Sequence, residues 1–123
     1  MNYLERLVER YPALDGMKDT IEEAFQIMKA SYENGGKLLV CGNGGSASDS
    51  DHIVGELMKG FYKKRPLSEA EKEKFGGLSE HLQGALPAIS LAGHPALSTA
   101  FLNDVNPEIT VEGFGRKLGQ GAF

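Results

Sequence analysis

Apolar residues recur at helical spacing in two stretches that precede the first predicted strand. The first stretch covers residues 2–10 and places its apolar side chains on one side of a helix: Tyr3, Leu4, Leu7 and Val8. The second runs from about Leu14 to Asn34, and Asn34-Gly35-Gly36 favours a helix end there. Its apolar side consists of Met17, Ile21, Ala24, Phe25, Met28 and Tyr32. These two predicted helices need a surface to cover, which is either the chain's own sheet or another subunit.

A predicted strand, a glycine-rich loop and a third helix follow in direct succession. Lys37–Cys41 is an apolar run with almost no polar alternation, which is typical of a strand covered on both faces. The segment Gly42–Ser48 then contains three glycines and two serines. A helix is predicted from about Ser48 to Tyr62, with one apolar arc: Ile53, Val54, Leu57, Met58 and Phe61. This order predicts a strand, a phosphate-sized turn and a helix whose N-terminus faces the turn.

The loop has the composition of an anion-binding turn. Gly42, Gly44 and Gly45 allow positive φ angles and let backbone N–H groups approach a ligand closely. The first turn of a helix leaves N–H groups unpaired and carries partial positive charge, which favours an anion. Ser46 and Ser48 add hydroxyl donors. The alternative is a tight strand-to-helix connection that binds nothing.

Three ionisable side chains follow the loop on the predicted third helix. Asp49, His52 and Glu56 are spaced by three and four residues, which stacks them on one face. We expect this face to lie at the edge of the buried arc, one to two turns from the loop. The His–Glu pair is either a surface ion pair or a catalytic or metal-binding pair.

Residues 63–84 form a charged insertion before the second predicted strand. Ser68-Glu69-Ala70-Glu71 is a capping box, so a short helix is predicted to start at Ser68 and to end at Gly76-Gly77. The charges mark either a solvated face or a lid over the loop. The lid would bring cationic side chains towards an anionic substrate: Lys63, Lys64 or Arg65.

The remaining elements complete a strand–helix–strand unit. A second strand is predicted at Ala88–Leu91, parallel to the first because a helix and a right-handed crossover lie between them. A short helix is predicted at Ala96–Leu102 and a loop at Asn103–Pro107, and Ile109-Thr110-Val111 could begin another element. The pattern therefore predicts an α/β fold.

Composition narrows the class of protein. The 123 residues are 41% hydrophobic and 24% charged, which is ordinary for one small globular domain. A net charge of −4 gives no indication of nucleic-acid or membrane binding, so an anion in the loop must be held by local dipoles and hydroxyls. Cys41 has no partner for an intrachain disulfide and is either a small core residue or a nucleophile. The charged N-terminus and the absence of a long apolar stretch predict a cytoplasmic protein.

The loop and the ionisable residues behind it resemble a known family. Cys41–Ala47 followed by Asp49, His52 and Glu56 is similar to the SIS (sugar isomerase) domain. The resemblance is closest to the phosphoheptose isomerases, which interconvert sedoheptulose 7-phosphate and an aldose heptose phosphate. It covers nearly all of residues 1–112 and continues in three later segments: Leu86–Leu91, Ala96–Ala100 and Asn103-Asp104.

The resemblance implies a doubly wound, three-layer α/β sandwich with a parallel sheet of flavodoxin-like or Rossmann-like type. Residues 1–123 would form a single SIS domain, with residues 1–35 as the helical extension that family members use in dimer and tetramer packing. Family chains continue into a third strand, a serine/threonine-rich phosphate loop and a late histidine acid. We therefore expect this chain to be a C-terminally truncated, partial domain. The resemblance favours an enzyme, whereas the missing loop and histidine favour a chain that is inactive alone.

The resemblance also assigns roles to individual residues. Glu56 matches the general base and His52 the histidine beside it, and some family members place zinc on this pair. The residues implied to bind the sugar phosphate are Asn43, Gly44, Gly45, Ser46 and Asp104. Aldose–ketose isomerisation through an enediol needs a carboxylate base within hydrogen-bond reach of the reacting carbons. The alternative is a non-catalytic SIS module of the replication-initiator-associating type, which binds phosphosugars or other proteins.

Overall fold

The computed structural model describes residues 2–106, which divide between two compact units. The first unit is Met1–Gly36 and the second is Lys37–Phe123, and each is described here by itself. Within residues 2–106, no helix has the length and apolar character that crossing a membrane requires.

The first unit is helical throughout. Its elements are α1 (Tyr3–Arg10), the 3₁₀ helix η1 (Pro12–Met17) and α2 (Lys18–Glu33). The Asn2 side chain caps α1 by accepting hydrogen bonds from the N–H groups of Leu4 and Glu5, at 3.1 and 3.3 Å. The helix predicted over residues 2–10 is thus confirmed.

The second helix differs from its prediction at the start and agrees at the end. A 3₁₀ helix occupies the stretch before Lys18, where Pro12 and Gly16 both weaken an α-helix. The Lys18 Nζ lies 2.9 Å from Asp15 Oδ1 and 3.5 Å from Glu5 Oε2, and the hydrogen bond to Asp15 raises the pKa of Lys18 above its usual value. At the other end, Gly35 adopts a φ of 75°, as expected for a glycine after a helix.

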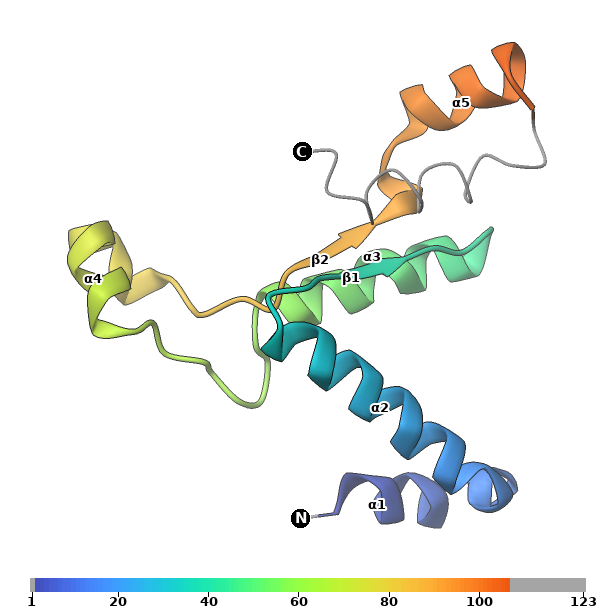
Figure 1. Ribbon diagram of the computed structural model, residues 1–123, viewed down its shortest axis with the longest axis horizontal. Helices are drawn as coiled ribbons and strands as arrows, with labels where there is room; N and C mark the ends of the chain where they lie inside the picture. The colour runs from blue at the N-terminus through green and yellow to red at the C-terminus, as the bar shows by residue number, and fades with distance from the viewer. Residues whose placement is uncertain (1, 107–123) are drawn as a thin grey trace. The chain divides into compact units, whose positions relative to one another are not determined.

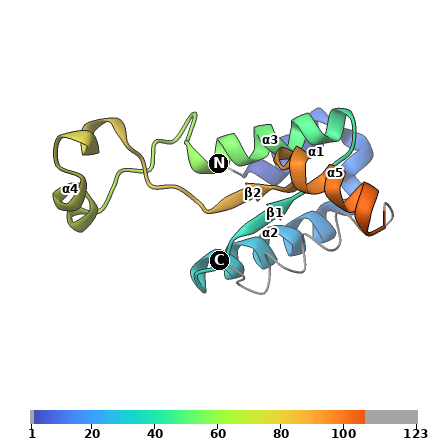
Figure 2. The same cartoon turned by 90° about the horizontal axis from the view of Figure 1, so that it is seen from above.

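The second unit is built on two short parallel strands. The strands β1 (Leu38–Val40) and β2 (Ala88–Ser90) pair with Leu38 opposite Ala88 and Val40 opposite Ser90. The helix α3 (Gly45–Met58) lies along them and connects the end of β1 to the insertion (Figures 1 and 2). The predicted parallel pair and the α/β fold class are therefore confirmed.

The core of this unit is small and centres on Leu91. This residue is 6% exposed and packs against three partly buried side chains: Leu39, Ile89 and Phe101. All three residues of β1 are half-buried, so the prediction of a strand fully covered on both faces is wrong for the described residues. The apolar arc predicted for the third helix is also partly wrong. Ile53 and Met58 are exposed, and Phe61 is exposed and lies outside α3.

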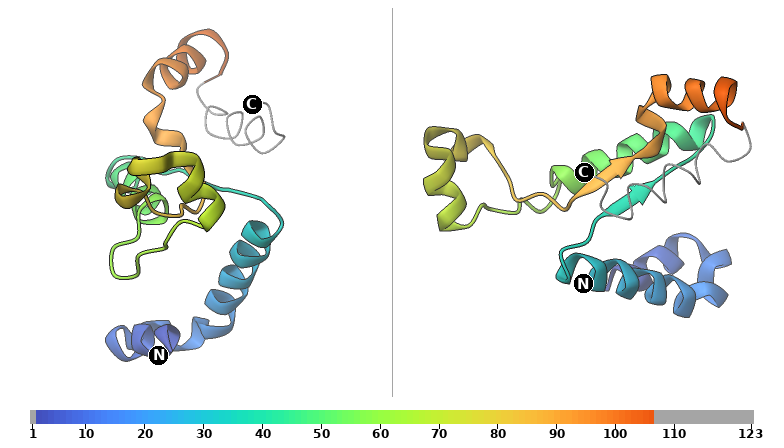
Figure 3. Two further views of the ribbon diagram at one scale, coloured as in Figure 1. Left: turned by 90° about the vertical axis from the view of Figure 1, so that its left-hand side faces the viewer. Right: turned by 45° about the horizontal axis from the view of Figure 1, so that its top comes forward.

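The charged insertion contains α4 (Glu69–Phe75) and the 3₁₀ helix η2 (Gly76–His81), after which the chain returns to β2 (Figure 3). The capping box is confirmed. The Ser68 N–H donates to Glu71 Oε2 at 2.8 Å, and the Glu71 N–H donates to Ser68 Oγ at 3.4 Å. Gly76 has a φ of 55° and ends the α-helix as predicted, but η2 follows it directly.

The last described elements follow β2 without a long connection. They are the 3₁₀ helix η3 (Leu91–Gly93) and α5 (Pro95–Asp104). The predicted helix at Ala96–Leu102 is confirmed, and it is longer than predicted. Asn103 and Asp104 belong to α5, so their assignment to a loop is wrong. The element proposed at 109–111 lies outside the described residues.

Candidate functional site

The glycine-rich loop joins the carboxyl end of β1 to the N-terminus of α3. Gly44 is the N-cap of α3, with φ 59° and ψ −125°. The Ser46 N–H donates to the Asn43 carbonyl at 3.2 Å, and the Ala47 N–H donates to the Gly44 carbonyl at 3.1 Å. The helix therefore begins at Gly45, three residues earlier than predicted. Ser46 belongs to the first helical turn.

Two of the loop glycines are required by the backbone itself. A Cβ added at Gly42 would overlap the Ser46 carbonyl oxygen and lie 2.6 Å from Ser46 Cβ, so only glycine lets the loop approach the helix this closely. Gly44 needs its positive φ, although open space surrounds its Cβ position. Gly45 has open space and an ordinary φ. Its lack of a side chain leaves the start of α3 uncovered.

The start of α3 offers donors to an anion. Within the described residues, the N–H groups of Gly44 and Gly45 donate no hydrogen bond, and Ser46 and Ser48 are both exposed. Unpaired N–H groups and the helix dipole favour negative charge at this position. The arrangement can therefore bind a phosphate-sized anion through amides and hydroxyls.

Ser50 is a buried residue of the site region that the sequence analysis missed. It is only 2% exposed, and its Oγ donates a hydrogen bond of 2.8 Å to the Ser46 carbonyl oxygen. A serine bonded to the carbonyl four residues earlier can satisfy its hydroxyl inside a helix. The sequence feature that could have indicated its burial is a small polar residue four positions after Ser46, on the helix that packs on the strands.

His52 and Glu56 form the pair that their spacing predicted. His52 Nε2 lies 3.8 Å from Glu56 Oε1, and the two side chains are 78% and 49% exposed. Asp49 is also exposed and forms no ion pair within residues 2–106. The predicted placement at the edge of the buried face is therefore wrong, because this face of α3 is open.

The His52–Glu56 pair lies about two to three turns along α3 from the glycine-rich loop. A rise of 1.5 Å per residue places the backbone of His52 about 9 Å, and that of Glu56 about 15 Å, along the axis from Ser46. Helical side chains lean towards the N-terminus, and the 3.8 Å approach to His52 shows that the Glu56 carboxylate reaches back one turn. The carboxylate and the imidazole thus share one position on the helix surface.

Asp104 is not brought to this site by any described contact. It is the last residue of α5 and is exposed. Within residues 2–106, no hydrogen bond or ion pair joins Asp104 to the loop or to α3.

A sequence comparison places these features in a family. The SIS domain matches residues 2–104 of this chain. The chain belongs to the SIS domain family. A relative named phosphoheptose isomerase, from Laribacter hongkongensis, is 34% identical over 119 residues, covering 97% of this chain and 52% of the relative. Another of that name, from Alkalilimnicola ehrlichii, is 29% identical over 128 residues, covering 98% of this chain and 56% of the relative. This SIS-domain chain thus spans about half the length of these curated relatives.

A zinc ion on His52 and Glu56 is only partly supported by the residues present. Two ligand atoms, each about 2 Å from a tetrahedral zinc, lie roughly 3.4 Å apart, which is close to the 3.8 Å between Nε2 and Oε1. Protein zinc sites use at least three protein ligands. No group of three or more histidine, cysteine, aspartate or glutamate side chains that could hold a metal occurs in the described part of this SIS-domain chain. The described residues therefore do not complete a zinc site.

The lid interpretation of the insertion is wrong for Arg65. The Arg65 guanidinium donates to the carbonyls of Leu57 and Gly84. Leu57 lies in the last turn of α3, about 18 Å along the helix axis from Gly45, where the loop ends. Arg65 is therefore fixed at the opposite end of α3 from the loop of the same chain.

Cys41 is exposed, so its interpretation as a small core residue is wrong. It directly follows β1, at the start of the loop.

Proposed function

We propose that this SIS-domain chain carries the loop and the catalytic helix of a phosphosugar isomerase of the phosphoheptose type. The reaction would interconvert sedoheptulose 7-phosphate and a heptose 7-phosphate through an enediol. The observation that carries the proposal is that one helix, α3, begins in an anion-binding turn and bears the His52–Glu56 pair at 3.8 Å. The two relatives named phosphoheptose isomerase support it.

The proposed roles follow from what each group can do. The amides of Gly44 and Gly45, with Asn43 and the Ser46 hydroxyl, would hold the phosphate at the N-terminus of α3. The Glu56 carboxylate would remove the proton from one of two adjacent carbons and return it to the other, so no external reactant is needed. The His52 imidazole, beside this carboxylate, would exchange a proton with the sugar oxygens.

Asp104 would contact a sugar hydroxyl. Its carboxylate can accept a hydrogen bond from an –OH group, which suits this role. Because no described contact joins Asp104 to the loop, this role requires α5 to move so that the Asp104 carboxylate reaches the sugar.

We also propose that the chain acts as a homo-oligomer, a dimer or a tetramer. The helix α2 has no buried residue, and several of its large apolar side chains are exposed: Phe25, Ile27 and Met28. Apolar surface of this kind on a helix marks a contact with a partner. Size-exclusion chromatography with light scattering would test it, and a monomer at micromolar concentration would contradict it.

Turnover of sedoheptulose 7-phosphate tests the proposed activity. The purified chain is incubated with the ketose, and the aldose product is followed by chromatography. Glu56→Gln should lower kcat by about a hundredfold or more, because a general base contributes about 10²–10⁴-fold. Glu73→Gln on α4, a helix of the insertion outside the proposed site, makes the same chemical change and should leave kcat unchanged. Equal rates for the two variants would contradict the role of Glu56.

The non-catalytic SIS module is the second candidate, because the described residues complete neither a zinc site nor a contact between Asp104 and the loop. A protein that only binds phosphosugar would show no turnover but a higher Tm in its presence, since a ligand that binds the folded state stabilises it. Loss of that Tm shift in Ser46→Ala would place binding at the loop.

A further inference from the structure

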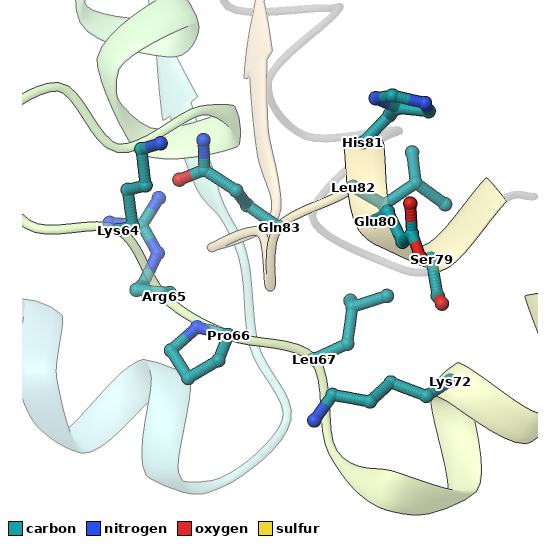
Figure 4. Close-up of a pocket in the computed structure, with 10 residues that line it drawn as sticks. All are labelled: Lys64, Arg65, Pro66, Leu67, Lys72, Ser79, Glu80, His81, Leu82 and Gln83. Atoms are coloured by element: carbon teal, nitrogen blue, oxygen red, sulfur yellow. The ribbon is translucent and has the colours of Figure 1, made fainter. Parts of the chain in front are cut away.

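The charged insertion forms an open pocket of its own, lined by none of the loop residues. It has a volume of about 460 Å³, within the range of small-molecule sites, and is lined entirely by residues between 64 and 83 (Figure 4). Pro66, Leu67 and Leu82 give it an apolar wall, and Leu67 is 8% exposed. None of the residues proposed for the isomerase site contributes to the lining.

The polar part of the lining carries an excess of positive charge. Arg65 gives its guanidinium hydrogen bonds to backbone carbonyls and forms no ion pair with a carboxylate within residues 2–106. Lys64 forms no ion pair within residues 2–106, whereas the Lys72 ammonium is paired with Glu69 at 2.6 Å. Glu80 is the one carboxylate among the lining residues. A pocket with this balance, in a chain of net charge −4, favours an anionic ligand.

Gln83 adds a polar side chain to the lining. Its Oε1 atom is buried without a hydrogen-bond partner, and a Cβ added at Gly60, outside the lining, would lie 3.2 Å from it, so a ligand in the pocket does not reach this oxygen. Figure 4 shows the Gln83 amide on the same side of the pocket as Lys64 and Arg65. Recognition of a ligand therefore rests on the positive charge of Lys64 and Arg65.

The base of the pocket is held in place by backbone contacts. The Gly84 N–H donates to the Arg65 carbonyl at 2.8 Å, and the Arg65 Nε donates to the Gly84 carbonyl at 2.7 Å. These two bonds tie the beginning of the insertion to its end. Arg65, one end of the lining, is therefore fixed without a ligand, which lowers the entropic cost of ordering this residue on binding.

We propose that this insertion pocket binds a small organic anion with a phosphate or carboxylate group. The site is separate from the glycine-rich loop, because Arg65 is bonded to the far end of α3. The proposal does not depend on the proposed isomerase activity, and either can fail alone.

Amide chemical shifts of the full chain test the site. The ¹⁵N-labelled protein is titrated with glycerol 3-phosphate and, separately, with lactate, each against sodium chloride at equal ionic strength. We expect shifts in residues 64–83 that exceed those in residues 42–48. The ligand that binds more tightly shows whether the pocket prefers a phosphate or a carboxylate group. Shifts confined to residues 42–48, or equal shifts with chloride, would overturn the proposal.

Matched variants distinguish binding in the pocket from non-specific attraction of an anion to nearby lysines. Lys64→Gln should weaken binding about fivefold, a typical effect of removing one partly exposed charge. Lys63→Gln removes the same charge one residue away, outside the lining, and should leave the affinity unchanged. Gln83→Glu should abolish binding, because it places a second carboxylate in the pocket. Equal losses of affinity in Lys63→Gln and Lys64→Gln would overturn the proposal. Unchanged amide chemical shifts outside the insertion confirm that each variant folds.

Discussion

The Ser50 hydroxyl donates to the Ser46 carbonyl oxygen at 2.8 Å, from a position of α3 that is only 2% exposed. Gly42 also lies against Ser46, so close to its carbonyl group that a Cβ at Gly42 would overlap it. The first turn of α3 is thus held from the strand side by Gly42 and from the helix by Ser50. This contact keeps the N–H groups of the turn in a fixed place.

Ser50 should be more sensitive to size than to loss of its hydroxyl. Ser50→Ala should cost about 1 kcal/mol or less of the free energy of unfolding, because the Ser46 carbonyl can keep its helical hydrogen bond. Ser50→Leu should cost about 1–3 kcal/mol, because extra methylenes must enter a closely packed space. Urea unfolding followed by circular dichroism measures both, with Ser48→Leu at an exposed position as the control. Equal costs for the two leucine variants would show that Ser50 is not closely packed.

The loop glycines should differ sharply in their tolerance of alanine. Gly42→Ala should lower the Tm by several degrees, because the new Cβ would overlap the Ser46 carbonyl oxygen, which is backbone and cannot turn aside. Gly45→Ala meets open space at an ordinary φ and should leave the Tm unchanged or slightly raised. Differential scanning calorimetry compares the two. A Gly42→Ala protein as stable as Gly45→Ala would contradict the close approach.

The helix α4 should lose stability in acid. The hydrogen bond from the Ser68 hydroxyl, followed by that from the Ser68 N–H, lowers the pKa of Glu71 below its ordinary value of 4.5. A carboxyl with a lowered pKa stabilises the folded form above its unfolded pKa, and this contribution is lost as the pH falls through the lower, folded pKa. Amide exchange of residues 69–75, corrected for the intrinsic pH effect, should therefore show less protection below pH 4.5.

Glu71→Gln should remove most of this pH dependence. Glu73→Gln, on the same helix, should preserve it, because the Glu73 carboxylate takes no part in the capping box. The same acid profile in both variants would contradict the assignment to Glu71.

Arg65 should stabilise the end of α3 and the base of the insertion together. Arg65→Gln should cost about 1–2 kcal/mol, because it removes hydrogen bonds to the Leu57 and Gly84 carbonyls and a cation from a helix C-terminus. Arg65→Lys should recover only part of this, since an ammonium cannot reproduce the guanidinium fork. Chemical denaturation measures both variants. A fully stable Arg65→Gln protein would contradict the anchoring role.

Much of the fold followed from local patterns. The helix over residues 2–10 and the capping box at Ser68 were predicted correctly. So was the parallel pairing of the strands predicted at Lys37–Cys41 and Ala88–Leu91, although both strands are shorter in the structure. Each depends on interactions between residues close in sequence, or on the rule that a helix between two strands makes them parallel. The family was also evident from the loop and the His–Glu spacing.

Other features depended on contacts that local patterns do not contain. The burial of Ser50 and the exposure of Ile53 were not predicted, because they depend on how α3 is rotated against the strands. The start of α3 at Gly45 was missed for a local reason, since glycine is a poor helix former. The exposure of Cys41 and the anchoring of Arg65 at Leu57 depend on the path of the chain after β1 and after α3.

The sequence by itself determined the order of elements and the chemistry of the loop, because periodicity and glycine placement act locally. The tertiary structure alone decided which face of α3 is buried. It also decided that the Arg65 guanidinium turns back onto the last turn of α3, because its hydrogen bond to the Leu57 carbonyl depends on the path that the chain takes between these two residues.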